Sequence, residues 1–189
     1  RIQVFDDQGN YISSWGSYGD GPGEFSQPSG IAVGHGYIFV VDNKLNTIQK
    51  FDSLGNFIMQ WGSFGNGNGE FTSPSGITVS ENKFVYVVDT GNNRIQKFTF
   101  DGEYISSFGK SDNREGNLNS PRDIAIDATG KLFVTDPGNK RINVYKDDGE
   151  FLRTLDSSVG GFSIFPTGII FDKNNNFYIS DQTNNRIIQ

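Results

Sequence analysis

Short apolar runs separated by polar turns recur along the whole chain. Runs such as Ile38-Phe39-Val40-Val41 contain consecutive apolar residues, which favours a strand that is covered on both faces. Others, such as Thr47 to Asp52, mix Gln and Lys with apolar residues, as expected where one side of a strand begins to meet water. Gly, Asn and Asp mark the turns, and no segment has sustained helical periodicity. The pattern predicts an all-β chain.

The same pattern repeats about every 46 residues, the length of a four-stranded propeller blade. Prolines recur at intervals of 46, 47 and 45, and aspartates at 47, 47 and 45. These anchors are Pro28, Pro74, Pro121 and Pro166, with Asp42, Asp89, Asp136 and Asp181. We therefore predict a single β-propeller domain over 1–189, built of four-stranded antiparallel blades, with four repeats at about 1–46, 47–93, 94–140 and 141–185.

Four motifs carry a resemblance to the NHL-repeat family. They are Pro28-Ser29-Gly30-Ile31-Ala32-Val33, Tyr37 to Asp42, Arg94-Ile95-Gln96-Lys97-Phe98, and Gly62 to Phe71. The resemblance covers the whole chain and implies a propeller, most often of six blades. It also implies a spread of roles: protein or RNA binding, sensor domains on kinases, and a metal-dependent amidating lyase. Fold carries over from such a resemblance further than function does.

The repeats are out of phase with the blades. Arg1-Ile2-Gln3 matches Arg186-Ile187-Ile188, so the chain starts in a third strand. Strands at Arg1 to Asp6 and Tyr11 to Trp15 would then complete a blade begun by Thr167 to Asp181. A closed four-bladed ring, a segment of a larger propeller such as a six-bladed one, and a two-chain ring of eight blades all stay open. Open strand edges would allow self-association.

Charge and composition exclude some functions. The net charge is −6, and residues 1–93 hold 4 basic and 9 acidic side chains, so no basic stripe for nucleic acid is present there. Nucleic acid is disfavoured as a partner. The chain has no Cys, which removes thiolate chemistry and disulfides. No stretch approaches the roughly 20 apolar residues of a membrane span, and we predict no membrane insertion. The compartment stays open, an extracellular or cell-surface location being one hypothesis.

The candidate binding site is the face that carries the crossover loops and the connections between second and third strands. Residues that follow the anchor prolines differ between repeats on a constant frame, and such differences suit specificity. The predicted channel-mouth residues are Ser29, Ser75, Arg122, Thr167, Asn43, Lys44, Leu45, Asn92, Asn139, Lys140 and Gln182. Arg122 and Lys140 are its cationic points, which favours a neutral or acidic partner group.

A second set of polar residues is expected to be structural. Asp and Arg recur five residues apart in three repeats, as Asp89 with Arg94, Asp136 with Arg141, and Asp181 with Arg186. This recurrence favours a structural role, in which the Asp accepts hydrogen bonds from the backbone amides of the turn and the Arg donates charge-assisted bonds to carboxylate or backbone oxygens. The first repeat departs from this pattern, because Thr47 stands where the others have Arg.

Little in the sequence indicates catalysis. His35 is the only histidine and lies between two glycines in a turn, so neither a His-based zinc site nor a Ser-His triad can form. The glycine-rich loops Gly19 to Glu24 and Gly65 to Glu70 lack phosphate-loop or calcium-loop spacing. We predict that they cross between blades, with Phe25 and Phe71 in the core. Trp15, Trp61 and Phe108 share one repeat position, which favours core over a glycan platform.

These observations favour a non-catalytic binding or scaffold propeller that presents its loop face to a protein, peptide or glycan. No enzyme activity, cofactor or metal is predicted. Two alternatives remain. One is a structural repeat unit of a surface assembly or filament. The other is a calcium-dependent hydrolase or lyase, in which Asp127 and Asp172, at the ends of two inner strands, would face the channel.

Overall fold

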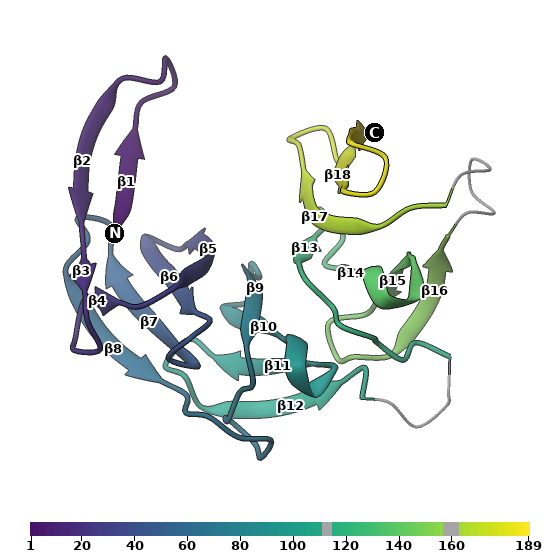
Figure 1. Cartoon of the computed structure of the whole chain (residues 1–189), viewed down its shortest axis with the longest axis horizontal. Helices are drawn as coiled ribbons and strands as arrows, with labels where there is room; N and C mark the ends of the chain where they lie inside the picture. Colours follow the sequence, from purple (N-terminus) through teal and green to yellow (C-terminus); the bar gives the residue numbers. More distant parts are fainter. Residues whose placement is uncertain (111–114, 157–162) are drawn as a thin grey trace.

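The chain is an open arc of β-blades. The computed structural model describes residues 1–110, 115–156 and 163–189. Figure 1 shows the blades following one another around the arc, with the N-terminal hairpin and the C-terminal sheet facing each other across open space. The predicted all-β propeller of four-stranded antiparallel blades is confirmed. The four-bladed closed ring is not formed.

Three blades have all four strands among the described residues, and a fourth has three. They are β5 (Pro28–Gly34), β6 (Tyr37–Asp42), β7 (Thr47–Asp52) and β8 (Phe57–Trp61) in blade 1; β9 (Pro74–Val79), β10 (Phe84–Asp89), β11 (Arg94–Thr99) and β12 (Tyr104–Phe108) in blade 2; β13 (Ile124–Ile126), β14 (Leu132–Asp136), β15 (Arg141–Tyr145) and β16 (Phe151–Leu155) in blade 3; and β17 (Pro166–Phe171), β18 (Phe177–Asp181) and β19 (Arg186–Ile188) in blade 4.

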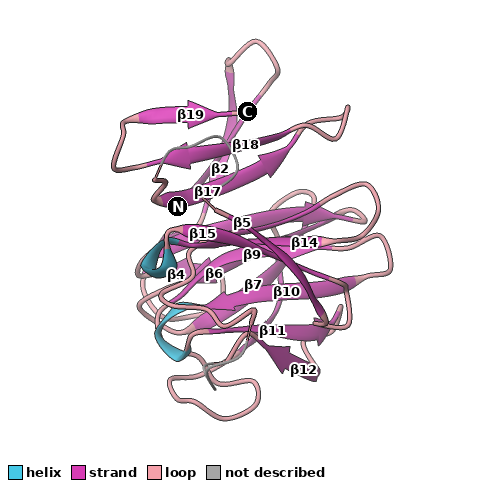
Figure 2. Cartoon of the chain, turned by 90° about the vertical axis from the view of Figure 1, so that its right-hand side faces the viewer, coloured by secondary structure: helices cyan, strands magenta, loops and turns pink. Residues whose placement is uncertain are grey.

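The remaining elements are short. β1 (Ile2–Phe5) pairs with β2 (Tyr11–Trp15), and β3 (Ser17–Tyr18) pairs in parallel with β4 (Glu24–Phe25). Two 3-10 turns, η1 (Thr90–Asn92) and η2 (Pro137–Asn139), connect second to third strands. Figure 2 shows both turns (cyan) on the same side of the disc. We call this side the loop face.

Strands within a blade pair in sequence order through tight turns. In blade 2, Asp89 opposes Arg94 at the β10–β11 turn, and Phe98 opposes Tyr104 where a bulge shifts the β11–β12 register. Bulges at this position recur in every hairpin of third and fourth strands. A bulge increases the local twist of a strand, and the recurrence gives the outer hairpins one common shape.

Blades 2 and 3 each contribute to two hydrophobic cores, one with each neighbour, and blade 1 shares one core with blade 2 and another with the N-terminal hairpin. Adjacent residues of β6 belong to different cores: Val40 packs with Phe25 and Phe51, whereas Val41 packs with residues of blade 2. In β10 the same division places Val87 with blade 1 and Val88 with blade 3. Successive side chains point to opposite faces of a strand. The consecutive apolar residues in the sequence therefore reflect burial on both faces.

Two buried lysines connect neighbouring blades. Lys50 Nζ donates to the Phe100 carbonyl at 2.8 Å and lies 3.2 Å from the Asp101 carboxylate. Lys97 Nζ donates to the Asp147 carbonyl at 2.8 Å, and the ammonium lies 4.0 Å from the centre of the Phe84 ring. Each lysine is therefore stabilised by the next blade's outer turn together with cation–π contacts.

The N-terminal hairpin does not complete blade 4. β1 and β2 form their own sheet, separate from β17, β18 and β19. The hairpin packs on blade 1 instead, since Trp15 lies 4.4 Å from Phe51, ring centre to ring centre. Ile2 and Trp15 thus pack against Val40 and Phe51 of blade 1 and against Phe25 of β4.

Gly102 and Gly130 offer a test of inter-blade contact. Both have positive φ, +78° and +83°, but a Cβ on Gly102 would lie 2.9 Å from the Trp61 ring, whereas a Cβ on Gly130 meets nothing within 4 Å. Both Ala substitutions should cost about 1–2 kcal/mol for the left-handed backbone. Gly102→Ala should lose at least about 1 kcal/mol more through the clash. Urea unfolding measures both, and equal losses would contradict the contact.

Candidate functional site

A buried aspartate ends the second strand of each blade and organises the loop face. All four are at most 1% exposed. Each carboxylate accepts a hydrogen bond from a backbone amide of the crossover loop, and the four pairs are Ser26 to Asp42 (2.7 Å), Thr72 to Asp89 (2.8 Å), Asn119 to Asp136 (2.7 Å) and Phe165 to Asp181 (3.0 Å). The loop face is therefore held at its base by charge-assisted bonds.

Three of these aspartates form ion pairs with the arginine that begins the third strand. The Nε of Arg94, Arg141 and Arg186 lies 2.8, 3.0 and 3.0 Å from the carboxylate of its blade. Arg94 is the most buried of the three, with a side chain 3% exposed. Its terminal nitrogen also donates to the Gly67 and Glu70 carbonyls at 2.6 and 2.9 Å. The arginines connect the crossover loop to the blade.

Several predicted channel-mouth residues bond to the neighbouring blade. Ser29 Oγ donates to the Ser75 carbonyl at 3.3 Å, and Ser75 Oγ donates to the Arg122 carbonyl at 2.6 Å. Asn43 Nδ2 donates to the Pro74 carbonyl at 2.9 Å. These side chains connect adjacent blades, and the hydroxyl hydrogens of Ser29 and Ser75 are already used.

Other predicted residues bond within their own blade. Asn92 and Asn139 donate to the buried aspartate of their blade at 3.0 and 2.9 Å. Thr167 Oγ1 lies 3.0 Å from Ser180 Oγ. Asn184 Nδ2 makes the equivalent bond to Asp181 at 2.7 Å. Sequence reasoning named Gln182 there and missed Asn184, although the Asp-x-x-Asn spacing of blades 2 and 3 would have identified it.

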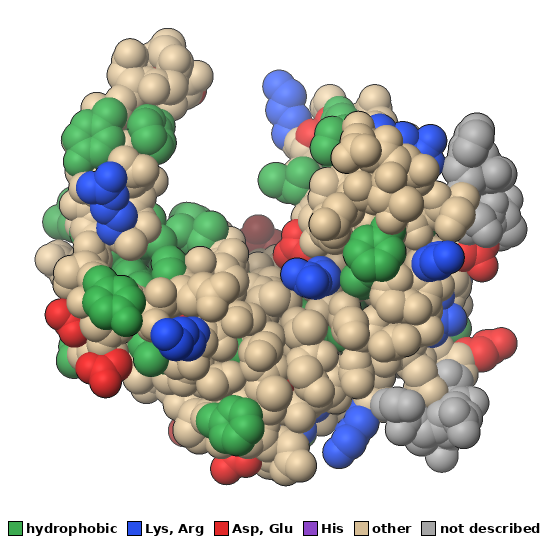
Figure 3. Space-filling view, in the orientation of Figure 1, with side chains coloured by type: hydrophobic (Ala, Val, Ile, Leu, Met, Phe, Trp, Pro, Cys, Tyr) green, Lys and Arg blue, Asp and Glu red, His purple; other side chains and the backbone are tan. Residues whose placement is uncertain are grey.

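The remaining predicted residues are available to a partner. Lys44, Arg122, Lys140 and Gln182 are exposed, and in the described chain their side chains make no hydrogen bond or ion pair. Leu45 is half-buried, and its amide, like that of Lys44, donates to Asp42. Figure 3 views the loop face and shows Lys and Arg side chains (blue) spread across it on both arms of the arc. This face can attract acidic groups.

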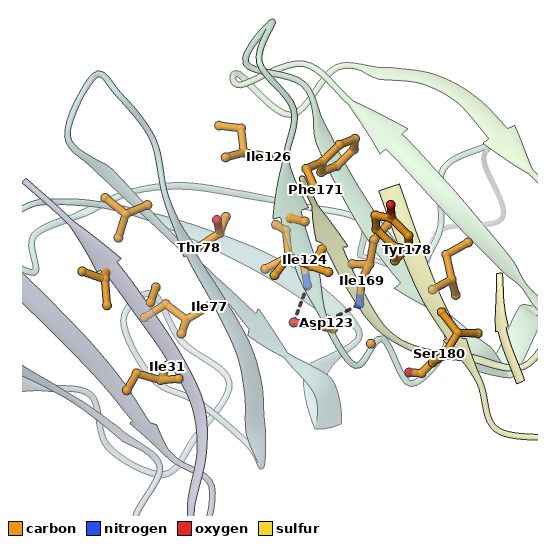
Figure 4. A pocket seen from close by; sticks show the side chains of 18 residues that line it. Ile31, Ile77, Thr78, Asp123, Ile124, Ile126, Ile169, Phe171, Tyr178 and Ser180 are labelled. Atoms are coloured by element: carbon orange, nitrogen blue, oxygen red, sulfur yellow. Dashed lines mark hydrogen bonds between the residues drawn. The ribbon is translucent and has the colours of Figure 1, made fainter. Parts of the chain in front are cut away.

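The inner strands line an open pocket of about 570 Å³ at the centre of the arc. Aliphatic side chains from all four inner strands form its wall, among them Ile31, Ile77, Ile124 and Ile169. Asp123 is the acidic residue in this lining. Figure 4 shows it between β13 and β17, bonded to both strands. The pocket thus joins an apolar wall to one carboxylate.

Asp123 occupies a position that is Gly30, Gly76 and Gly168 in the other blades. Its carboxylate accepts the amides of Ile124 at 2.9 Å and Ile169 at 3.0 Å. Burial raises the pKa of this carboxyl above its ordinary value, and the two amide bonds oppose the shift. Sequence reasoning missed Asp123, although its replacement of a repeated glycine was the available signal.

The remaining candidate residues, His35, Asp127 and Asp172, lie in turns and make hydrogen bonds there. His35 is exposed in its turn, and its Nε2 lies 3.1 Å from the Ser80 carbonyl. Asp127 Oδ1 accepts the amides of Thr129 and Lys131, both at 2.8 Å. Asn176 donates to Asp172, which lowers the pKa of that carboxyl. Within the described ranges no group of three or more His, Cys, Asp or Glu side chains is placed to hold a metal.

Comparisons with known proteins identify the architecture. A family model described as a 6-bladed beta-propeller matches residues 1–53 and 34–109, which together span more than half of the chain. A search of curated proteins gives no match. No helix in the described ranges is long and apolar enough to cross a membrane.

Solved structures with a similar fold include enzymes and a protein complex. Virginiamycin B lyase from Staphylococcus aureus is 20% identical, with a TM-score of 0.66 over 86% of this chain and 51% of that one. A chain of a nidogen/laminin complex is 21% identical, with a TM-score of 0.65 over 87% and 59%. A chain of Kuenenia stuttgartiensis hydrazine synthase is 12% identical, with a TM-score of 0.64 over 92% and 52%. The chain spans about half the length of these structures.

One prediction from the sequence is corrected by these comparisons. We predicted that the chain is not an enzyme, but virginiamycin B lyase is an enzyme that shares the fold. The prediction relied on the single histidine and the absence of a triad. A propeller can support catalysis by other residues, so those absences do not exclude an enzyme. NHL membership is likewise not confirmed, since the matching family model is a 6-bladed propeller.

Removing the Arg94 guanidinium should destabilise the protein. Arg94→Ala removes the buried cation that pairs with the Asp89 carboxylate and one donor from each of the Gly67 and Glu70 carbonyls, which should lower the free energy of unfolding by about 1–3 kcal/mol. Arg186→Ala is the matched control and should lose less, because the Arg186 side chain is 35% exposed. Urea denaturation of both variants measures the difference. An unchanged unfolding midpoint for Arg94→Ala would contradict a structural role.

Asp123 should make stability depend on pH. Its raised folded-state pKa means that the protonated carboxyl contributes stability, present in full below the ordinary pKa of 3.8. This contribution is lost as pH rises through the higher pKa of the folded state. Unfolding free energies from about pH 3 to pH 7 should therefore decline for wild type relative to Asp123→Asn. Parallel profiles would show that the pKa is not raised.

Proposed function

Because the chain belongs to the 6-bladed beta-propeller family, we propose that it is a binding propeller whose loop face recognises an acidic protein or peptide segment. The observation that carries this proposal is the set of exposed side chains Lys44, Arg122 and Lys140, which lack internal partners in the described chain. They stand on one face of a protein with a net charge of −6. Complementary charge favours fast and specific association.

The rigidity of the loop face supports binding. Each connection is tied to a buried aspartate, and η1 and η2 end in residues whose backbone N–H groups close the turn. Side chains presented on a fixed frame lose less conformational entropy when they bind. Ser29 and Ser75 each connect their blade to the next, while the cations are free to contact a partner.

The nidogen/laminin neighbour adds general support for a protein partner, because one chain of that complex has a similar fold. The filament alternative would require self-association, which the solution mass of the chain measures directly.

The inner pocket favours a second candidate function, recognition or conversion of a small molecule. Its apolar wall and the buried Asp123 carboxyl form the combination expected of a ligand site. Asp123 would accept a hydrogen bond from the ligand or exchange a proton with it. Among the similar structures are lyases named for virginiamycin B and for streptogramin B.

A peptide array with matched acidic, neutral and basic sequences tests the first proposal. Acidic peptides should bind best, and the double variant Arg122→Glu with Lys140→Glu should weaken their affinity by about tenfold or more. Lys173→Glu, on the opposite face, is the matched control and should leave affinity unchanged. A preference for basic peptides, or a loss confined to Lys173→Glu, would contradict a loop-face site.

A further inference from the structure

Blade 1 lacks the arginine that the other blades place beside their buried aspartate. Asp42 is fully buried, yet its cross-strand partner is Thr47, where blade 2 pairs Asp89 with Arg94. Directly opposed residues of a strand pair share one face of the sheet. Thr47 therefore approaches the same surroundings as Arg94, with a side chain too short to fill them.

The oxygens that bind the guanidinium in blade 2 are repeated in blade 1. Arg94 contacts the Asp89 carboxylate and the Gly67 and Glu70 carbonyls. Their equivalents in blade 1 are the Asp42 carboxylate and the Gly21 and Glu24 carbonyls, because the loop Gly19 to Glu24 repeats Gly65 to Glu70.

The two loops have the same internal bonds. In blade 1, the Glu24 amide donates to the Gly21 carbonyl at 3.0 Å, and Gln49 Nε2 donates to the Glu24 carbonyl at 2.7 Å. The equivalent bonds in blade 2 measure 3.2 and 2.7 Å. The Gly23 amide donates to Gln49 Oε1 at 2.8 Å, and the Gly69 amide donates to the equivalent Gln96 Oε1 at 3.0 Å. The loop keeps its conformation although the arginine is replaced.

Thr47 adds an independent observation. The residue is 6% exposed, and its Oγ1 is buried with no hydrogen-bond partner in the described chain. A buried hydroxyl without a partner is costly. Asp42 accepts only backbone amides, from Ser26, Gln27, Lys44 and Leu45, and no described Lys, Arg or His side chain forms an ion pair with it. A buried carboxylate thus lies beside an unsatisfied oxygen.

We propose that blade 1 binds a monovalent alkali cation, sodium or potassium, in place of the guanidinium. The Asp42 carboxylate, Thr47 Oγ1 and the Gly21 and Glu24 carbonyls supply the ligands. All are oxygens, which suit hard cations. One carboxylate calls for one positive charge, so a monovalent ion replaces the arginine charge for charge. The cation ties the crossover loop to blade 1, as Arg94 does in blade 2.

Thermal unfolding in different chloride salts tests the site. Wild type should melt about 3–6 °C higher in sodium or potassium chloride, at roughly ten times the Kd, than in choline chloride of equal ionic strength. Choline is too large to enter, so it controls for screening. Thr47→Arg supplies the guanidinium and should melt higher with no dependence on the cation. Arg94→Thr is the reciprocal control and should gain such dependence.

Crystals grown in rubidium chloride provide a readout that does not depend on a variant folding. An anomalous peak beside Asp42 and Thr47 Oγ1 is the expected result. Absence of that peak, with equal melting of wild type in all three salts, would overturn the proposal and assign the position to water. Equal cation dependence in wild type and Thr47→Arg would also overturn it, since the ion would then bind elsewhere.

Discussion

The structure depends on the packing of each blade against its neighbours. A lone four-stranded sheet cannot cover both of its apolar faces, and in blades 2 and 3 the next blade covers one and the previous blade the other. Ile77, Ile124 and Ile169 are at most 7% exposed, whereas the equivalent Ile31 of blade 1 is 52% exposed. Ile31 lies on the face of blade 1 that has no full blade packed on it, so exposure follows from position in the arc.

Charged side chains stabilise the loops and interfaces around these hydrophobic cores. Buried aspartates hold the crossover loops, arginines hold the aspartates, and lysines reach from one blade to the outer turn of the next. The aspartates, Arg94 and both lysines are buried, and each has hydrogen-bonding partners, as the cost of burying charge requires. The loop face can be polar at its surface and rigid underneath because these bonds lie below it.

The fold could be predicted from the sequence because the same pattern of strands and turns recurs in each repeat. Anchors at Pro28 and Asp42 recur in each copy, and every repeat supports the same assignment of strands. The blade order and the two-sided cores followed from that recurrence. The arrangement of the N-terminal hairpin did not, because sequence phase indicates which strands could pair but not whether blade 4 and the hairpin meet in space.

The candidate sites were harder to predict, since repeats emphasise what is shared. Ser29 and Asn92 are polar residues in loops, which made them candidates for binding a partner. In the structure both donate hydrogen bonds within the protein, Ser29 to the Ser75 carbonyl and Asn92 to Asp89. Asp123 and Thr47 are single departures from the repeat, and their meaning depends on three-dimensional surroundings: an amide of another blade for Asp123, and the carbonyls of a loop for Thr47.

The lysine contacts give the blades an order. Lys50 requires the Phe100 carbonyl and aromatic rings beside it, and Lys97 requires the carbonyl of Asp147, while blade 3 has Val144 at the same position. The two acceptor carbonyls occupy equivalent turn positions, but the side chains beside them differ: the centre of the Phe100 ring lies 4.5 Å from Lys50 Nζ, whereas the Asp147 carboxylate lies 4.0 Å from Lys97 Nζ. A blade moved to a different place would exchange these contacts. The copies are therefore not equivalent: the interfaces between blades 1 and 2 and between blades 2 and 3 each depend on side chains of the blade that follows, and exchanging the repeats would change both.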